Sequence, residues 1–488
     1  MSAPNLILLA LLIPLLAAVG IAMTARWPNL REGVTLVAAA VLIMAVWSLI
    51  PTIQDGGRPQ LVIGEMLPGL VFAFRVEPLG MLFAALASLL WIVNSIYSIG
   101  YLRGNKEGHQ TRFYLCFAIA IAATMGVAFA ENLLTLFLCY EILTLSTYPL
   151  VAHKGDPETV KSARIYLGIL IATSIGLFLP AILWTQALAG TLTFTPGGIL
   201  AGNITGAATG LLLGLYVFGI GKAAVMPVHR WLPAAMVAPT PVSALLHAVA
   251  VVKAGVFSIT KVMVYVFGGE FLDSQPGTDW LVPVACFTII AASVVALRQT
   301  NLKRMLAYST ISQLSYIVMA AAVLTPLSEI GAAVHMVAHG FGKITLFFAA
   351  GAIYVASHKT DITQLNGIGW RMPFTMTAFT LGALSMIGVP PTAGFVSKWY
   401  ILGGSLKAQD YLAVLTLAGS TALNAAYFLP VLYRAWFQSF PDDSEQDHGE
   451  APWPMLMALM ITAALTVLFF LFNQPVLDLE SQLAGQVP

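Results

Sequence analysis

Five lysines lie inside long apolar stretches of this sequence, while the other eighteen of its 23 basic residues lie near the ends of such stretches or between them. An ionisable residue within a membrane span is by default a functional one. Arginine keeps its proton at every accessible pH, whereas a desolvated lysine can release its proton near neutrality. The use of lysine alone therefore indicates proton carriers rather than fixed scaffold charges. The five are Lys222, Lys253, Lys261, Lys343 and Lys398.

Glu141 is the acidic counterpart of these lysines, because it alone of the 22 acidic residues lies deep within an apolar stretch. It is about ten residues from either end, which at about 1.5 Å per residue is near the middle of a bilayer. A lone carboxylate there costs several kcal/mol unless it is paired or protonated. We interpret Glu141 as a proton-binding or charge-coupling acid; a structural ion pair between two helices is the alternative.

Histidines accompany two of the lysines. His335, His339 and Lys343 follow at i, i+4 and i+8, which places them on one helix face. A histidine pair at this spacing can bind a metal, but the cationic Lys343 opposes one. We expect a polar file for protons, with a structural hydrogen-bond network as the alternative. His247 precedes Lys253 by six residues, and a relay role and a core role both stay open for it.

Two of the lysines lie in stretches that are too long for one straight span and that contain prolines. Lys222 lies in 207–240 and Lys398 in 373–407. Such residues break helices, and broken helices face polar cavities in transporters. The other deep lysine is Lys253, whereas Lys261 lies nearer a span end, where snorkelling to the interface is an equal alternative. The prolines next to the two breaks are Pro227, Pro390 and Pro391.

The composition requires lipid as the solvent for most of the chain. Of the 488 residues, 58% are hydrophobic and 9% charged, against about 25% charged in soluble domains. The net charge of +1 gives no case for a nucleic-acid partner. Three scattered cysteines lack metal or disulfide spacing. Neither a nucleotide loop nor a haem or cluster motif is present, so we expect no cofactor and no metal. The first apolar run is followed, not preceded, by basic residues, which favours a retained span over a cleaved signal.

A span needs about 20 apolar residues, and the chain has room for about fourteen. We therefore predict an all-α polytopic membrane protein with two inverted five-helix repeats, each containing a proline-broken helix. The expected divisions are 1–110 (helices 1–3), 111–270 (first repeat), 271–440 (second repeat) and 441–488 (an acidic loop, Asp442 to Glu450, and helix 14). The expected spans lie near 4–23, 33–53, 79–101, 112–130, 132–152, 163–187, 207–240, 243–267, 278–297, 303–323, 328–357, 373–407, 410–437 and 453–473.

Positive charge sets the orientation of such a chain. With fourteen spans, fifteen of the basic residues outside the spans fall on one face and three on the other. The three are Arg58, Arg75 and Lys407. We therefore expect both termini to be extracytoplasmic.

Three segments carry a family resemblance. The stretches 229–255 (HRWLPAAMVAPTPVSALLHAVAVVKAG), 335–348 (HMVAHGFGKITLFF) and 388–404 (GVPPTAGFVSKWYILGG) resemble the antiporter-like proton-conducting membrane subunits. That superfamily includes Mrp-type multisubunit cation/proton antiporters and the large membrane subunits of complex I. The resemblance extends over about 65–440, and the chain looks most like the D-type subunit of Mrp antiporters. His247, however, is similar to the A-type pattern.

The resemblance implies fourteen helices, two inverted repeats, a bacterial inner-membrane location and a complex of several membrane subunits. It carries the family's key residues onto Glu141, Lys222, Lys253 and Lys398. It further implies proton transport, with Na⁺ as a coupled cation. In our hypothesis an ion pair between Glu141 and Lys222 keeps the lysine charged and acts as a gate. Lys253 and the histidine face then form the relay, and Lys398 is its far end.

Several functions share this machinery. The leading hypothesis is a subunit of a sodium/proton antiporter. The alternatives are a proton-pumping subunit of a complex I-type redox complex and the energising subunit of an inorganic-carbon uptake complex. A membrane scaffold without transport is disfavoured by the cost of five lysines in the bilayer.

Overall fold

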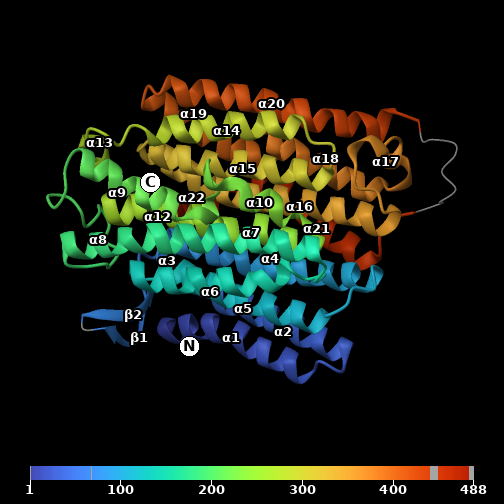
Figure 1. Ribbon diagram of the computed structural model, residues 1–488, viewed down its shortest axis with the longest axis horizontal. Coiled ribbons are helices and arrows are strands. Elements are labelled where there is room, and N and C mark those ends of the chain that lie inside the picture. Colours follow the sequence, from blue (N-terminus) through green and yellow to red (C-terminus); the bar gives the residue numbers. More distant parts are fainter. Residues whose placement is uncertain (1, 68, 440–448, 483–488) are drawn as a thin grey trace.

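The computed structural model describes residues 2–67, 69–439 and 449–482, so the expected acidic loop lies almost wholly outside the described residues. The chain folds into a bundle of helices that run side by side, with α1 and α2 at one edge and α20 at the opposite edge (Figure 1). The first part contains α1 (Ala3–Met23), α2 (Pro28–Trp47), α3 (Ile50–Gln54), β1 (Gln60–Leu67), β2 (Leu70–Arg75), α4 (Pro78–Gly104), α5 (Gln110–Phe129), α6 (Leu133–Val151), α7 (Pro157–Thr173), α8 (Leu179–Ala189), α9 (Ala207–Gly219), α10 (Trp231–Ala234), α11 (Thr240–Ala244), α12 (Val251–Val262) and α13 (Gly269–Ser274). The second contains α14 (Leu281–Leu297), α15 (Leu302–Ala322), α16 (Pro326–Ser357), α17 (Ile368–Arg371), α18 (Pro373–Ile387), α19 (Ala393–Lys407), α20 (Tyr411–Phe437), α21 (Trp453–Leu471) and α22 (Gln474–Ser481).

The predicted helical membrane architecture is confirmed. Within the described residues, eleven helices are long and apolar enough to cross a membrane, and three shorter apolar helices accompany them. The shorter ones are α9, α14 and α18, and two of these end at the predicted breaks. The count of fourteen spans, the inverted repeats and the residue divisions stay predictions.

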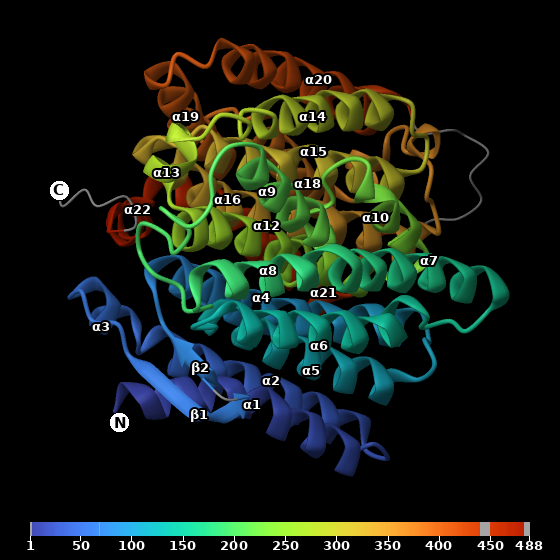
Figure 2. The same ribbon diagram turned by 60° about the vertical axis from the view of Figure 1, so that its left-hand side comes forward.

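A β-hairpin between α3 and α4 is an element that the sequence reasoning missed. β1 and β2 pair antiparallel, with Gln60 opposite Arg75. A Pro-Gly pair between two apolar segments was the available signal for the turn. The hairpin packs beside α1 at one end of the bundle, near α3 (Figure 2).

The two proline-containing stretches break as expected. α9 ends at Gly219, the short 3₁₀ turn η2 (Gly221–Ala223) contains Lys222, and helix resumes only at α10. The second break lies between α18 and α19, where Gly388 has φ +91°, a left-handed conformation that favours glycine. Freed backbone groups at such breaks need new partners. At the first break, the indole Nε1 of Trp231 donates to the carbonyl of Gly221 at 2.9 Å.

The centre of the bundle is formed by α16 and by the helical stretch from α11 to Phe267, whose most apolar 18-residue windows are entirely buried. α16 packs against α15, α18, α19 and α21. The ring of Tyr97 from α4 stacks on Phe348 of α16 with centroids 3.8 Å apart. Because the histidine face and Lys343 belong to α16, this packing holds them inside the protein rather than in lipid.

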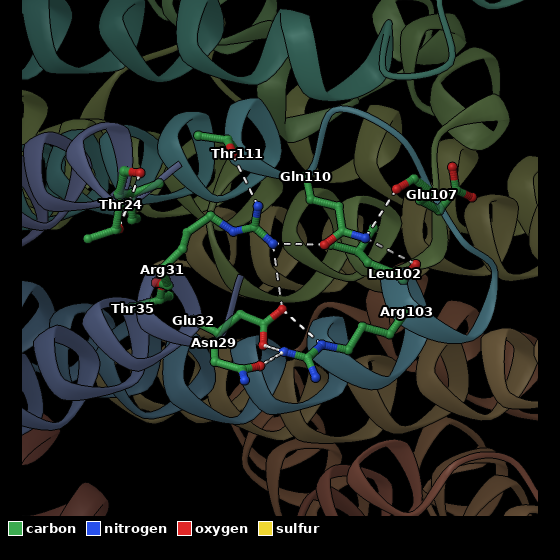
Figure 3. Close-up of polar contacts among 11 residues, drawn as sticks. Thr24, Asn29, Arg31, Glu32, Thr35, Leu102, Arg103, Glu107, Gln110 and Thr111 are labelled. Carbon is green, nitrogen blue, oxygen red and sulfur yellow. Dashed lines mark hydrogen bonds and ion pairs between the residues drawn. The ribbon is translucent and has the colours of Figure 1, made fainter. Parts of the chain in front are cut away.

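A polar cluster fastens the outlying α2 to the bundle (Figure 3). Arg31, at the start of α2, donates to Gln110 Oε1 at 2.8 Å and to Thr111 Oγ1 at 3.1 Å. The neighbouring Glu32 pairs with Arg103 at the end of α4. Both Arg31 and Glu32 are buried, so these contacts satisfy charges that apolar surroundings would otherwise penalise.

Candidate functional site

Lys222 is fully buried at the first break and is held by α6. Its Nζ donates to the carbonyl oxygen of Tyr140 at 2.8 Å and to Thr144 Oγ1 at 2.6 Å. The same ammonium lies 3.0 Å from the centroid of the Tyr140 ring, in cation–π geometry. Tyr140 and Thr144 are four residues apart, so they share one face of α6. The lysine therefore has partners that suit its charged form but no carboxylate in contact.

Glu141 does not form the expected ion pair with Lys222. None of the ion pairs within the described residues includes Glu141, and neither of its carboxylate oxygens has a hydrogen-bond partner there. The physical reason is helical geometry, because Glu141 is rotated by about 100° from Tyr140 around α6. Glu141 still lies close enough to influence Lys222 electrostatically. A direct Glu141–Lys222 gate is therefore absent from this conformation.

Lys222 and Lys253 belong to backbone segments in direct contact. A Cβ atom on Gly255 of α12 would overlap the carbonyl carbon of Lys222 and the backbone nitrogen of Ala223. Only glycine permits this approach. The first break therefore lies against the helix that carries Lys253.

Lys253 makes the contact that the sequence order predicts between the eighth and eleventh spans. Its Nζ lies 2.6 Å from Nδ1 of His339, and both side chains are fully buried. The rings of His339 and His335 lie one helical turn apart, with centroids separated by 6.1 Å. The Nε2 atoms of both histidines have no partner among the described residues. Each ring therefore has one nitrogen engaged and one available for proton transfer.

The row continues from His335 to the second break. His335 Nδ1 lies 2.8 Å from Ser397 Oγ, and Ser397 precedes Lys398 in α19. Tyr316 of α15 bridges the same gap, because its ring centroid lies 5.4 Å from that of His335 and 5.1 Å from the Lys398 Nζ. Lys253, His339, His335 and Lys398 therefore form one buried row that crosses from α12 through α16 to α19.

Lys398 caps a broken helix. Its Nζ donates to the carbonyl oxygens of Met386 and Ile387 at 3.0 and 2.8 Å, and to Thr421 Oγ1 at 3.3 Å. These carbonyls are the last of α18, which ends at Ile387. A helix C-terminus carries a partial negative charge, so a cation there is favourable. The ammonium thus replaces the partners that the break removed.

Two predicted residues occupy less connected positions. Lys343, one turn beyond His339 on α16, is buried and donates to the carbonyl of Leu306 at 3.3 Å. His247 lies in a π-helical turn, η5 (Leu245–Val249), and neither ring nitrogen has a partner within the described residues. Its ring packs on Phe347, with centroids 4.7 Å apart. The structure therefore supports a place for Lys343 beside the row, and the role of His247 stays a prediction.

Lys261 does not snorkel to water. Only 1% of its surface is exposed, and its Nζ donates to the carbonyl of Ala130 at 2.7 Å. Sequence reasoning could not decide this point, because the groups that cover Lys261 come from distant parts of the chain. As for metals, the described residues contain no group of three or more His, Cys, Asp or Glu side chains positioned to hold an ion.

The sequence profile described as NADH:quinone oxidoreductase/Mrp antiporter, transmembrane, matches residues 130–424, which is more than half of the chain. The chain belongs to this family. The matched region includes every residue of the buried row described above. Membership and the apolar helices together establish a multi-pass membrane protein.

Relatives within the NADH:quinone oxidoreductase/Mrp antiporter family come from two kinds of assembly. The chain is 30% identical to NADH-quinone oxidoreductase subunit N of Desulforudis audaxviator (strain MP104C), over 97% of both chains. It is 30% identical to the A-type subunit of the Na(+)/H(+) antiporter of Bacillus subtilis (strain 168), covering 78% of this chain and 49% of that protein. The fold matches a chain of the Mrp complex from Dietzia sp. DQ12-45-1b with a TM-score of 0.85 and 21% identity, over 99% of this chain and 97% of that one.

Proposed function

We propose that this chain is the proton-translocating membrane subunit of a multisubunit monovalent cation (Na⁺)/proton antiporter. Protons move along the buried row formed by Lys253, His339, His335 and Lys398. The observation that carries the proposal is the 2.6 Å contact between Lys253 Nζ and His339 Nδ1 in the fully buried centre of the bundle. An amine and an imidazole in direct contact can exchange a proton without bulk water.

Charge repulsion supplies the coupling in this mechanism. At an effective dielectric of about 20, two unit charges 4 Å apart interact by about 4 kcal/mol. That energy corresponds to about three pKa units. A proton arriving at Lys253 therefore disfavours a second charge on His339, and charge moves along the row in steps. Lys222 receives or delivers its proton beside α12, and Glu141 acts through space rather than through an ion pair.

A second candidate is a proton-pumping subunit of a complex I-type redox complex. The match to NADH-quinone oxidoreductase subunit N over 97% of both chains favours it. The resemblance to the D-type subunit of Mrp antiporters and the carbon-uptake alternative stay predictions, since neither is distinguished by the row itself.

The location and orientation are part of the proposal. We place the protein in the bacterial inner membrane among other membrane subunits, with both termini extracytoplasmic. The excess of basic residues on one face supports this orientation. Under it, the β-hairpin face is the outer face.

The test is transport by the purified complex in proteoliposomes. A Na⁺ gradient should drive proton movement that a pH-sensitive dye reports, and Lys253→Met or His339→Leu should reduce the rate by at least tenfold. Lys154→Met is the matched control, because Lys154 is exposed. Proton movement driven by quinone reduction rather than by Na⁺ would select the redox complex. Full transport by assembled Lys253→Met complexes would refute the row.

A further inference from the structure

A second acid–base pair lies at the hairpin end of the bundle, outside the row. Lys261 of α12 is 1% exposed and Glu77, at the N-cap of α4, is 5% exposed. Their Nζ and Oε2 atoms are 3.9 Å apart. Glu77 Oε2 has no hydrogen-bond partner within the described residues. A buried carboxylate oxygen without a donor is costly unless it has a function.

The pair connects a cavity with the interior. A cavity of about 380 Å³ opens on this face, and Glu77 forms part of its wall together with Arg75, Gln60 and Tyr265. Lys261 does not line it; its ammonium lies behind Glu77, on the carbonyl of Ala130 at the end of α5. The cavity therefore reaches Glu77 first and Lys261 second.

The surrounding charges are already occupied, which leaves Glu77 free to exchange a proton. Arg75 pairs with Glu131, and Gln60 donates to both oxygens of the same carboxylate at 2.7 and 2.8 Å. Glu131 is therefore a fixed, fully bonded acid beside the pair. Glu77 in contrast has Lys261 as its ion-pair partner.

Lys261 stands on the helix that carries Lys253. The two residues are eight positions apart, which is about 12 Å along α12. Phe257 lies midway on nearly the same face, and its ring centroid is 5.6 Å from the Lys261 Nζ. The arrangement is a buried lysine near the cavity, an aromatic spacer, and the buried lysine of the row.

We propose that Glu77 and Lys261 form the proton-transfer pair that connects the hairpin-face cavity to Lys253, an inference that rests on the proposed function. In the outward direction the Lys261 ammonium gives its proton to the Glu77 carboxylate, which leaves a neutral amine and a carboxylic acid. The acid then releases the proton to water in the cavity. Inward transfer follows the same steps in reverse.

The experiment measures proton transport by the assembled complex in proteoliposomes. Glu77→Gln removes the acid, and Lys261→Arg keeps the charge but not the ability to release a proton; each should lower the rate at least tenfold. Because both act on one step, the double variant should be no slower than the slower single variant. Glu270→Gln, an exposed acid in α13, is the control and should transport normally.

Three results separate this inference from the proposed function. Wild-type rates in both single variants, in complexes that Lys253→Met inactivates, would overturn the pair and leave the row standing. A wild-type complex that moves no protons would overturn both. Multiplying losses in the double variant would show two separate steps and refute the pair.

A cysteine probe keeps the inference testable if those variants fail to assemble. Val264 lines the cavity and is half-buried, whereas the native Cys116, Cys139 and Cys286 are buried. A membrane-impermeant cationic thiol reagent should modify Val264→Cys from one side of the membrane only and reduce transport at least fivefold. Modification that leaves transport unchanged, or no modification from either side, would overturn the proposed route.

Discussion

Replacing Lys398 by arginine tests whether the row needs a residue that can lose its proton. The Lys398 ammonium satisfies the last carbonyls of α18 at 2.8 and 3.0 Å. A guanidinium has five N–H donors and can serve the same carbonyls. Lys398→Arg therefore keeps the charge and the helix cap, and we expect the complex to assemble.

The size of the effect follows from the two reference pKa values. Lysine has a pKa of about 10.4 and arginine one of about 12.5 to 13.8. If the site acts equally on both, the neutral form is about 100 to 1,000 times rarer for arginine at any pH. A proton-release step at residue 398 should slow by this factor, since about 1.4 kcal/mol corresponds to each factor of ten.

The assay is the initial rate of proton movement in proteoliposomes, normalised to assembled complex. Lys407→Arg is the control, because Lys407 lies on the same helix, α19, and is exposed. Lys398→Met should also stop transport, but it removes the cap and should lower the melting temperature as well. A Lys398→Arg complex that transports at the control rate would show that deprotonation is irrelevant and would refute the reasoning from the missing arginines.

Two titrating groups outside the spans give pH-dependent stability of opposite sign. Burial, with Arg112 nearby, lowers the pKa of His153 from 6.5 to about 4, so stability is lost as pH falls between these values, by up to about 3 kcal/mol. His153→Gln should flatten the melting temperature across that range, and an unchanged slope would contradict the assignment. Burial raises the pKa of Glu480, in the short helix α22, from 4.5 to about 8, so its stabilising neutral form is lost as pH rises towards and past 8. Hydrogen exchange should show α22 opening above pH 8 in the wild type but not in Glu480→Gln, and equal protection of both at about pH 9 would refute this.

The sequence predicted the depth of the charged residues better than their partners. Lys222, Lys253 and Lys398 are buried as expected, and both proline-containing stretches break next to a lysine. These features follow from the local order of apolar, charged and proline residues. The family resemblance supplied the two inverted repeats, which neither the helices nor the comparisons test.

The remaining features depend on how helices rotate against one another, which one sequence does not encode legibly. Glu141 and Tyr140 are adjacent in α6, yet only Tyr140 contacts Lys222, through its ring and its carbonyl oxygen. Position along a helix fixes depth in the membrane, while the direction of a side chain is set by packing against distant segments. Lys261 illustrates the same limit, because its cover comes from Ala130 and Glu77.

The two breaks hold their lysines in different ways, and this difference bears on coupling. Lys222 is held by another helix, through the ring and carbonyl of Tyr140. Lys398 is held by the end of its own broken span, through Met386 and Ile387. Loss of charge at Lys222 therefore weakens contact between the first break and α6. Loss of charge at Lys398 removes the cation from the C-terminus of α18, where the helix dipole favours one. Proton release at the far end of the row should thus act on the geometry of the second break itself, which makes that break the element best placed to pass a change in protonation to neighbouring subunits.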